Sequence, residues 1–346
     1  MKILYSIQAT GNGHISRAME LIPLLEKYGT VDLLLSGANS TLPLSYPVKY
    51  RSRGLSLFYT CTGTLDHWKL FKTLNPVRVM RDVKDLPVEK YDLILNDFDC
   101  ITALACAFKK VRSVNFGHQA SFYSPHTPRP DKVSKVGEWV LRNYARASQY
   151  VGLHFESYDD FILTPVIKKE ILQANPKNLG HVTVYLPSYC DKQLTATFSS
   201  FKEFRFEIFS RETNHPIKNG NLNFIPVGKN AFDESLINCM GIVTGAGFET
   251  PAEALYLQKK LLAIPIKGQY EQQCNAAALK KLGATTLDRI DDDFGGIFCN
   301  WAENATSPAV KYPYSNDAIV EQVMMQVFEN YPHTARIPVP DSLLLN

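Results

Sequence analysis

The chain has 346 residues, of which 45% are hydrophobic and 21% are charged, and its formal net charge is +3. This length can hold two domains with complete cores, and the composition excludes a disordered chain and a disulfide-rich scaffold. No apolar run approaches the ~20 residues of a membrane span. The seven cysteines include no C-x-x-C pair, which predicts reduced thiols in a cytoplasmic protein without a zinc site.

Strand-like and helix-like segments alternate through residues 1–165, which predicts a first domain with a parallel, doubly wound sheet. Residues 2–8 are too short and too soon interrupted by Gln8 to be a signal peptide, so they form the first expected strand. Further strands are expected at 31–36, 48–51, 93–96, 111–116 and 149–155, and helices at 15–28, 98–109 and 132–147.

The loop A-T-G-N-G-H-I-S-R over residues 9–17 joins the first strand to the first helix. It contains Gly11 and Gly13, but Ser16 takes the place of the third glycine of a dinucleotide-binding fingerprint. The loop also lacks the lysine of a phosphate-binding loop. His14 stands at the turn from strand to helix and is a candidate site residue.

The second half repeats the alternation. Residues 166–180 are expected to link the domains, and a second doubly wound domain is expected over 181–314. An amphipathic helix is expected over 315–331, followed by an extended tail to residue 346 that contains three prolines. The strands of the second domain are expected at 181–186, 205–209, 222–227, 241–244 and 261–266.

Residues 241–278 carry the most specific pattern in the chain. A buried strand leads through a glycine turn into a helix that has Pro251 in its first turn, where a missing N–H costs little. Such a turn leaves free N–H groups and the positive end of the helix dipole directed at one point, which predicts an anion site, most naturally for phosphate. The residues expected around this site are Gly245, Ala246, Gly247, Phe248, Glu249 and Thr250.

Two further groups extend this site. Glu253 lies one helical turn further along, where its carboxylate could accept hydrogen bonds from sugar hydroxyls next to the phosphate. Glu271 and Gln272 follow the next expected strand, so they should emerge beside the first helix start. Together these residues predict a pocket for a sugar nucleotide.

The pattern G-x-G-x-x-T-x-x-E, then a strand ending in proline, then [DE]-Q-x-x-N-A resembles the donor-binding half of GT-B glycosyltransferases. Within this family it resembles the UDP-glucuronosyl and UDP-glucosyltransferases and the lipid-linked N-acetylglucosaminyltransferase of peptidoglycan synthesis. The matching positions are Gly245, Gly247, Thr250, Glu253, Pro265, Glu271, Gln272, Asn275 and Ala276.

This resemblance implies two Rossmann-like domains with an active-site cleft between them, and a last helix that crosses back to the first, acceptor-side domain. In the family the glycine turn and helix start hold the diphosphate, the helix glutamate binds ribose, and the acid–glutamine pair holds the donor sugar. The N-terminal glycines Gly11 and Gly13 would approach the donor phosphates across the cleft. Ser188 would touch a phosphate, although Pro187-Ser188-Tyr189 replaces the usual glycine-rich turn.

The resemblance also suggests the chemistry. A base must take the proton of an acceptor hydroxyl, and His14 is the candidate because histidine titrates near neutral pH. Asp97 is expected to orient it, with Asp99 as the less favoured neighbour. Two alternatives remain open: His14 could make only a structural hydrogen bond or a phosphate contact, and Asp97 could be a helix N-cap. His118 is a second acceptor-side candidate, or else a capped-loop histidine.

The predicted activity is transfer of a sugar from a donor, expected to be UDP-linked, to an unidentified hydroxyl acceptor, with inversion and without a metal or other cofactor. Residues 121–150 combine aromatic and basic side chains, so they either touch a lipid or cell-envelope glycan acceptor at the inner membrane face or simply pack on the sheet. No nucleic-acid partner is expected. A UDP-N-acetylglucosamine 2-epimerase and a non-catalytic partner protein with the same scaffold are the alternatives.

Overall fold

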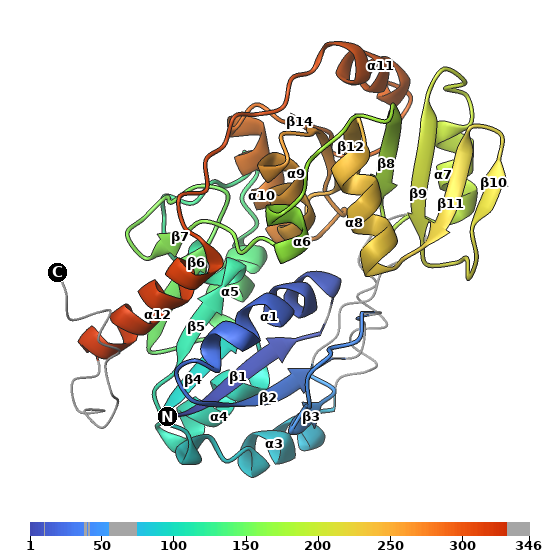
Figure 1. Ribbon diagram of the computed structural model, residues 1–346. Helices are drawn as coiled ribbons and strands as arrows, with labels where there is room; N and C mark the ends of the chain where they lie inside the picture. Colours follow the sequence, from blue (N-terminus) through green and yellow to red (C-terminus); the bar gives the residue numbers. More distant parts are fainter. Residues whose placement is uncertain (10, 38–39, 41, 55–74, 331–346) are drawn as a thin grey trace.

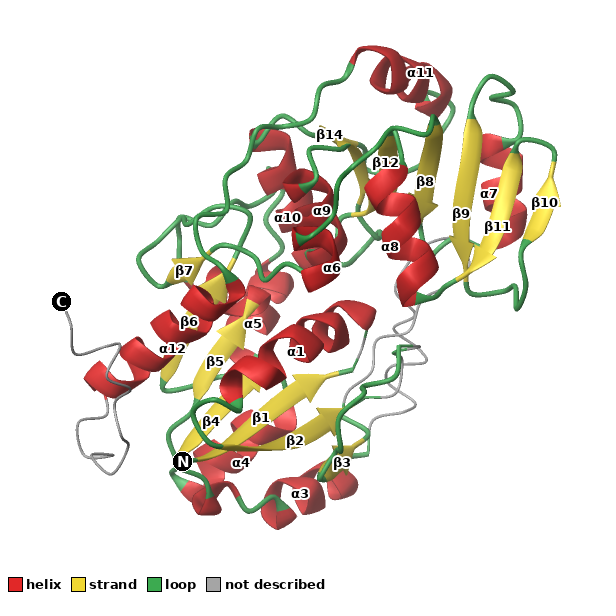
Figure 2. Ribbon diagram, viewed as in Figure 1, coloured by secondary structure: helices red, strands yellow, loops and turns green. Residues whose placement is uncertain are grey.

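Two parallel sheets form the framework of the protein in the computed structural model, which describes residues 1–9, 11–37, 40, 42–54 and 75–330. Figures 1 and 2 show the sheets lying one above the other, each with helices on its faces. The first sheet has the strand order β3-β2-β1-β4-β5-β6-β7 and is parallel throughout. Its strands are β1 (Lys2–Gln8), β2 (Thr30–Ser36), β3 (Tyr50–Ser52), β4 (Leu93–Asp97), β5 (Val114–Gly117), β6 (Gln149–Leu153) and β7 (Ile162–Leu163).

Helices bury both faces of this sheet, which explains why its strands are apolar throughout rather than alternating. Leu21 and Leu25 of α1 (Asn12–Leu25) and Val323 of α12 (Asn316–Asn330) belong to one core with β1 and β5. On the other face, α3 (Pro76–Asp85) and α4 (Cys100–Lys109) cover Leu4 and Ile94. Shorter elements complete this half: η1 (Val88–Lys90), η2 (His118–Tyr123) and α5 (Lys135–Asn143).

The second sheet has the order β10-β11-β9-β8-β12-β13-β14, and only the edge pair β10–β11 is antiparallel among the described strands. Its strands are β8 (His181–Tyr185), β9 (Arg205–Ser210), β10 (Ile217–Asn219), β11 (Leu222–Pro226), β12 (Gly241–Gly245), β13 (Lys260–Ile264) and β14 (Thr285–Thr286). Its helices are α7 (Asp191–Phe198), α8 (Lys229–Asn238), α9 (Glu249–Tyr256), α10 (Tyr270–Lys281) and α11 (Phe294–Asn304), and α6 (Lys169–Leu172) precedes it.

The strand order of each sheet reverses at one place, and in doubly wound sheets ligands bind at the carboxyl ends of the strands at that point. In the first sheet the reversal lies between β1 and β4, which end at Gln8 and Asp97. In the second it lies between β8 and β12, which end at Tyr185 and Gly245. The topology therefore brings the 9–17 loop, Asp97, Ser188 and the glycine turn to the two places where a ligand is expected.

The last helix returns to the first half of the molecule, where Figure 1 shows α12 beside α1 and β6. The amide of Gln149 in β6 donates to the carbonyl of Gln326 at 3.0 Å, and Asn316 exchanges two hydrogen bonds with the backbone of Ile167. The chain therefore crosses between the halves twice. The expected tail over 332–346 and Cys61 lie outside the described residues.

The elements differ from the predicted ones in a few places. Helix α1 begins at Asn12 rather than at residue 15, so His14 lies in its first turn. Helix α3 was not predicted, and α5 begins at Lys135 rather than at residue 132. The expected linker contains the short helix α6. Four cysteines are buried as free thiols, namely Cys100, Cys106, Cys239 and Cys274.

Candidate functional site

A cavity of about 720 Å³ lies between the two halves and is lined by residues of both. Its walls bring together the N-terminus of α1, the start of α9 and the start of α10, which are far apart in the sequence. Asp97, Gly245 and Ala246 are not in its lining, and they lie in or next to β4 and β12. The predicted site residues that line it are Gly11, Gly13, His14, Ser188, Gly247, Phe248, Glu249, Thr250, Glu253, Glu271 and Gln272.

The start of α9 has the features of an anion site. The N-cap residue, Phe248, makes no side-chain hydrogen bond to this helix N-terminus, so its first N–H groups are not capped by that side chain. Gly247 lines the cavity, does not adopt a positive φ, and has open space where a Cβ would stand. The backbone conformation therefore does not require glycine at this position. The open space instead leaves room for a ligand group to approach the amides directly.

His14 and Asp97 meet in the structure. The Nδ1 atom of His14 lies 3.0 Å from Oδ1 of Asp97, and the carboxylate is fully buried behind the imidazole. The Nε2 atom of His14 lies on the far side of the ring, 3.4 Å from Nε2 of Gln119. With the proton on Nδ1 donated to Asp97, Nε2 is left as an acceptor at the cavity wall.

Asp97 is not a helix N-cap. The cap of α4 is its neighbour Asp99, whose side chain accepts hydrogen bonds from the backbone N–H groups of Ile101 and Thr102. This removes one alternative for Asp97 and gives Asp99 a structural role. Asp97 is thereby left for His14 and for a residue that was not predicted.

That residue is Arg17, which is buried on α1 and lines the cavity. Its Nη2 donates to both oxygens of Asp97, at 2.7 and 2.9 Å. Burial opposes ionisation of Asp97, but Arg17 and His14 together outweigh it and hold the pKa of the carboxyl below its usual value. Gly117 permits this approach, since a Cβ there would lie 2.6 Å from Oδ1 of Asp97.

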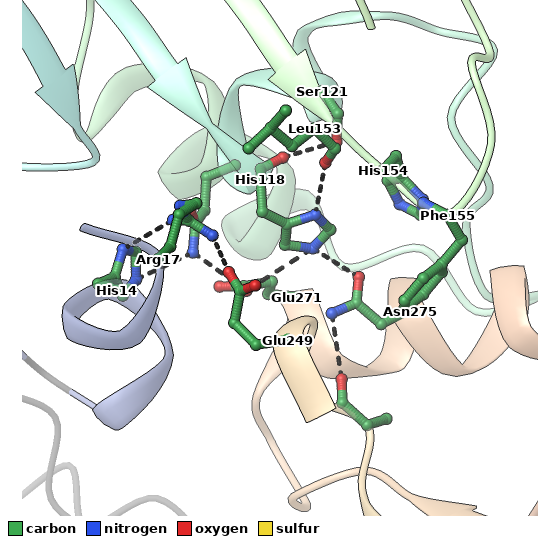
Figure 3. A network of polar contacts seen from close by, with 12 residues as sticks. His14, Arg17, His118, Ser121, Leu153, His154, Phe155, Glu249, Glu271 and Asn275 are labelled. Carbon is green, nitrogen blue, oxygen red and sulfur yellow. Dashed lines mark hydrogen bonds and ion pairs between the residues drawn. The ribbon is translucent and has the colours of Figure 1, made fainter. Parts of the chain in front are cut away.

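Arg17 also reaches across the cavity, as Figure 3 shows. Its Nη1 donates to the carboxylate of Glu249, the first residue of α9 in the second half. Burial raises the pKa of Glu249, and Arg17 partly offsets this rise. The Glu249 side chain passes close to Gly13, where an added Cβ would meet Cγ of Glu249 at 3.0 Å. The predicted phosphate site therefore contains an ion pair between the two halves.

Glu253 is also ion-paired. Lys168, in the segment between the two sheets, lies 3.1 Å from Oε2 of Glu253 and also contacts Asp233 of α8. The Glu253 carboxylate, which was expected to be available to sugar hydroxyls, is thus already paired with a lysine. The sequence did not indicate this pairing. One ammonium cannot neutralise two buried carboxylates, so burial raises the pKa of Glu253 to about 8 while Lys168 lies beside it.

This shift gives a pH dependence of stability. Because the pKa of Glu253 is raised in the folded state, the neutral carboxyl favours the fold at low pH, and this contribution is lost as pH rises from about 4.5 to about 8. We expect the free energy of unfolding of Glu253→Gln to fall less over this range than that of the unmodified protein. Urea denaturation at about pH 5 and about pH 8.5 measures both. A wild-type-minus-variant difference that is the same at both pH values would contradict the assignment.

Glu271 and Gln272 lie at the start of α10, and each side chain already makes a hydrogen bond within the protein. Gln119 donates to Oε1 of Glu271 at 3.1 Å, and burial raises the pKa of Glu271. The amide oxygen of Gln272 accepts from the backbone N–H of Ile266 at 2.9 Å, so its NH₂ group is the part left for a ligand. Ser188 is buried and lines the same cavity.

His118 belongs to the wall between the halves rather than to a surface loop. Its ring stacks on Phe248 with centroids 4.0 Å apart, and its Nε2 lies 2.8 Å from the amide oxygen of Asn275. Burial lowers the pKa of His118 to about 3. Figure 3 shows His118 between the first half and α10. His118 also lines the cavity, so these contacts join the two halves at the cavity wall.

The fold and the site together define a GT-B glycosyltransferase, as the sequence pattern predicted. A family model described as glycosyl transferase family 1 matches residues 1–298, so the chain belongs to this family. No curated protein sequence matches it significantly. No helix in the described ranges is long and apolar enough to cross a bilayer.

Solved structures with the same architecture include spinosyn forosaminyltransferase SpnP, which is 14% identical with a TM-score of 0.59 and covers 94% of this chain and 99% of its own. UGT89C1 of Arabidopsis thaliana in complex with quercetin is 13% identical with a TM-score of 0.59, covering 94% of this chain and 98% of its own. The structure of the same protein in complex with UDP-L-rhamnose is 16% identical with a TM-score of 0.53, and the match covers 96% of this chain and 95% of that one. At these identities the likeness shows the fold.

Proposed function

We propose that the protein transfers a sugar from a UDP-linked donor to a hydroxyl acceptor, with inversion at the anomeric carbon and without a metal ion. The observation that carries this proposal is the His14–Asp97 contact of 3.0 Å at the wall of a cavity whose other side is the uncapped start of α9. A base and an anion site thus share one cavity. The uridine base is favoured because solved structures of the same fold include complexes with UDP and UDP-L-rhamnose.

In this proposal the diphosphate binds at the amides around Gly247 and Thr250, and the sugar lies towards His14. Nε2 of His14 takes the proton of the acceptor hydroxyl while its oxygen attacks the anomeric carbon. The bond from that carbon to the diphosphate oxygen breaks on the opposite face, which inverts the configuration. The negative charge that forms on the leaving diphosphate is stabilised by the helix start. Asp97 stabilises the imidazolium that forms on His14.

The direct test is release of UDP from a panel of UDP-sugars with simple hydroxyl acceptors, with the product's anomeric configuration read by NMR and EDTA present in one arm. UDP release with an inverted product supports the proposal. Sugar epimerised at C2 would indicate an epimerase instead. Binding of UDP without any turnover would indicate a non-catalytic partner protein.

We further propose that α5 docks on an anionic membrane surface at the inner face of the cytoplasmic membrane, where a lipid-linked or cell-envelope glycan acceptor would be found. Val136 and Trp139 of this helix are 74% and 65% exposed, and Lys132, Lys135 and Arg142 beside them are exposed too. An exposed apolar face flanked by cations fits an anionic bilayer. None of residues 121–150 lines the cavity, so this segment would supply docking and not acceptor contacts.

Helix α5 lies beside the site, because the hydroxyl of Tyr270 at the start of α10 donates to Glu138 at 2.8 Å. We expect the protein to sediment with phosphatidylglycerol vesicles and Trp139→Ala with Val136→Ala to abolish this, since the apolar contact is lost. Ile217→Ala, which removes an apolar side chain that is 45% exposed on β10, is the matched control. Equal sedimentation of the α5 double variant and the control would exclude this docking face.

A further inference from the structure

Arg17 forms ion pairs with both halves of the protein at the cavity. Its guanidinium is bound on one side by Asp97, at the end of β4, and on the other by Glu249, at the start of α9. We infer that Arg17 is a positioning residue: held by Glu249 of the opposite half, it keeps the Nδ1 atom of His14 protonated and turned to Asp97. The inference rests on the proposed function, because it concerns the protonation pattern that the base requires.

The argument starts from the two neighbours of His14 Nδ1. Oδ1 of Asp97 lies 3.0 Å away and can only accept a hydrogen bond, whereas Nη2 of Arg17 lies 3.2 Å away and can only donate one. A protonated Nδ1 can donate a hydrogen bond to Asp97, whereas an unprotonated Nδ1 can accept one from Arg17. The two partners therefore favour opposite tautomers of the ring. Only the tautomer with Nδ1–H leaves the lone pair of Nε2 available to take a proton from an acceptor, and the Gln119 amide nitrogen, 3.4 Å from Nε2, is compatible with this tautomer because it can only donate.

The contacts of Arg17 decide this competition. Nη2 already donates to both oxygens of Asp97, and Nη1 donates to Glu249, so both terminal nitrogens are directed at carboxylates. The Glu249 contact fixes the plane of the guanidinium, because its donors form a rigid fork. Without that contact, Nη2 can turn towards Nδ1 and stabilise the tautomer that carries the proton on Nε2.

Glu249 reaches Arg17 only because the second half lies close to the first at this point. The side chain passes over Gly13, where a Cβ would stand 3.0 Å from Cγ of Glu249. Glu249 belongs to α9 and Arg17 belongs to α1, so separation of the halves breaks their contact. The base is therefore set in its active tautomer when the cavity is closed, which limits proton abstraction in the open form.

The test is the tautomer of His14 in protein labelled with ¹⁵N-histidine, with the signal assigned by its absence from His14→Asn. We expect Nδ1–H in the unmodified protein and a shift towards Nε2–H in Glu249→Gln, which keeps the shape of the side chain and removes its charge. If transfer activity is found, kcat should fall about tenfold or more. The affinity for UDP should be unchanged or higher, since a carboxylate leaves the anion site.

Two further variants sharpen the result. Arg17→Lys has one ammonium that cannot reach both carboxylates in the fork geometry, and it should shift the tautomer in the same direction. Tyr270→Phe removes another hydrogen bond between the halves, to Glu138 at 2.8 Å, away from His14, and should leave both tautomer and kcat unchanged.

An Nε2–H tautomer in the unmodified protein, or no change in Glu249→Gln and Arg17→Lys, would overturn the inference. An equal change in Tyr270→Phe would also overturn it, because general loosening would then be the cause. The tautomer is measured without substrate, so absence of transfer would count against the proposed function alone.

Discussion

His14→Ala should lower kcat by about 10²–10⁴-fold, the usual contribution of a general base, while the dissociation constant for UDP changes little. The imidazole contacts Asp97 at 3.0 Å and reaches the cavity with Nε2, whereas the anion site is formed by the start of α9 on the other side. Loss of the base removes proton abstraction but not nucleotide binding. Steady-state kinetics and calorimetric titration with UDP measure the two effects separately.

His215→Ala is the control, because His215 is an exposed histidine beyond β9 that does not line the cavity. It should behave like the unmodified protein in both measurements. If His14→Ala retained full turnover, His14 would not be the base. If it lost UDP binding in the same proportion as turnover, His14 would be a phosphate ligand, which is the alternative that the sequence left open.

The second large effect is expected for Gly247→Ala, which should weaken UDP binding about tenfold or more, equivalent to at least ~1.4 kcal/mol. A methyl group at this position would extend into the open space next to the helix amides, where the diphosphate is proposed to bind. The fold should not suffer, since Gly247 has no positive φ and an added Cβ meets no atom within 4 Å. The melting temperature should be equal or slightly higher, because alanine restricts the unfolded chain.

Gly296→Ala provides the matched comparison. An added Cβ at Gly296 in α11 also meets nothing within 4 Å, and this residue does not line the cavity. It should raise the melting temperature slightly, because alanine favours a helix more than glycine does, and it should have no effect on UDP binding. If Gly247→Ala bound UDP as tightly as Gly296→Ala, the nucleotide would bind elsewhere and the donor-site assignment would fail.

Most strands could be predicted because the sheets are covered on both faces. Their continuous apolar runs, such as residues 2–8, stand out in the sequence, and β1 begins and ends at those residues. Helix α3 could not be predicted in the same way. Its apolar side is narrow: Val83 is its only buried residue, Val79 packs against the same core, and Val77 and Met80 are exposed. Its start is instead marked by Asn75, which caps it, and by Pro76.

The candidate site could be proposed from the sequence where its signal is local. The glycine turn and the start of α9 adjoin one another in the chain, so residues 245–250 could be read as one anion site. The sequence did not indicate three residues of the site, Arg17, Lys168 and Asp233, because their roles depend on partners that are distant in the chain. Arg17 meets Asp97 and Glu249, which are 80 and 232 positions away, and Lys168 meets Asp233 at a separation of 65. The one local signal for Arg17 is its place one helical turn after His14.

The return of α12 to the first sheet has a consequence for how the protein could be divided. Val323 and its neighbours on α12 share a core with Leu25 of α1, although they come from the end of the described chain. A fragment that stops before residue 315 would leave that apolar surface bare, and a peptide carrying α12 added in trans should refill it. Because two covalent connections join the halves, we expect their relative motion to be mainly a rotation about the line between these connections.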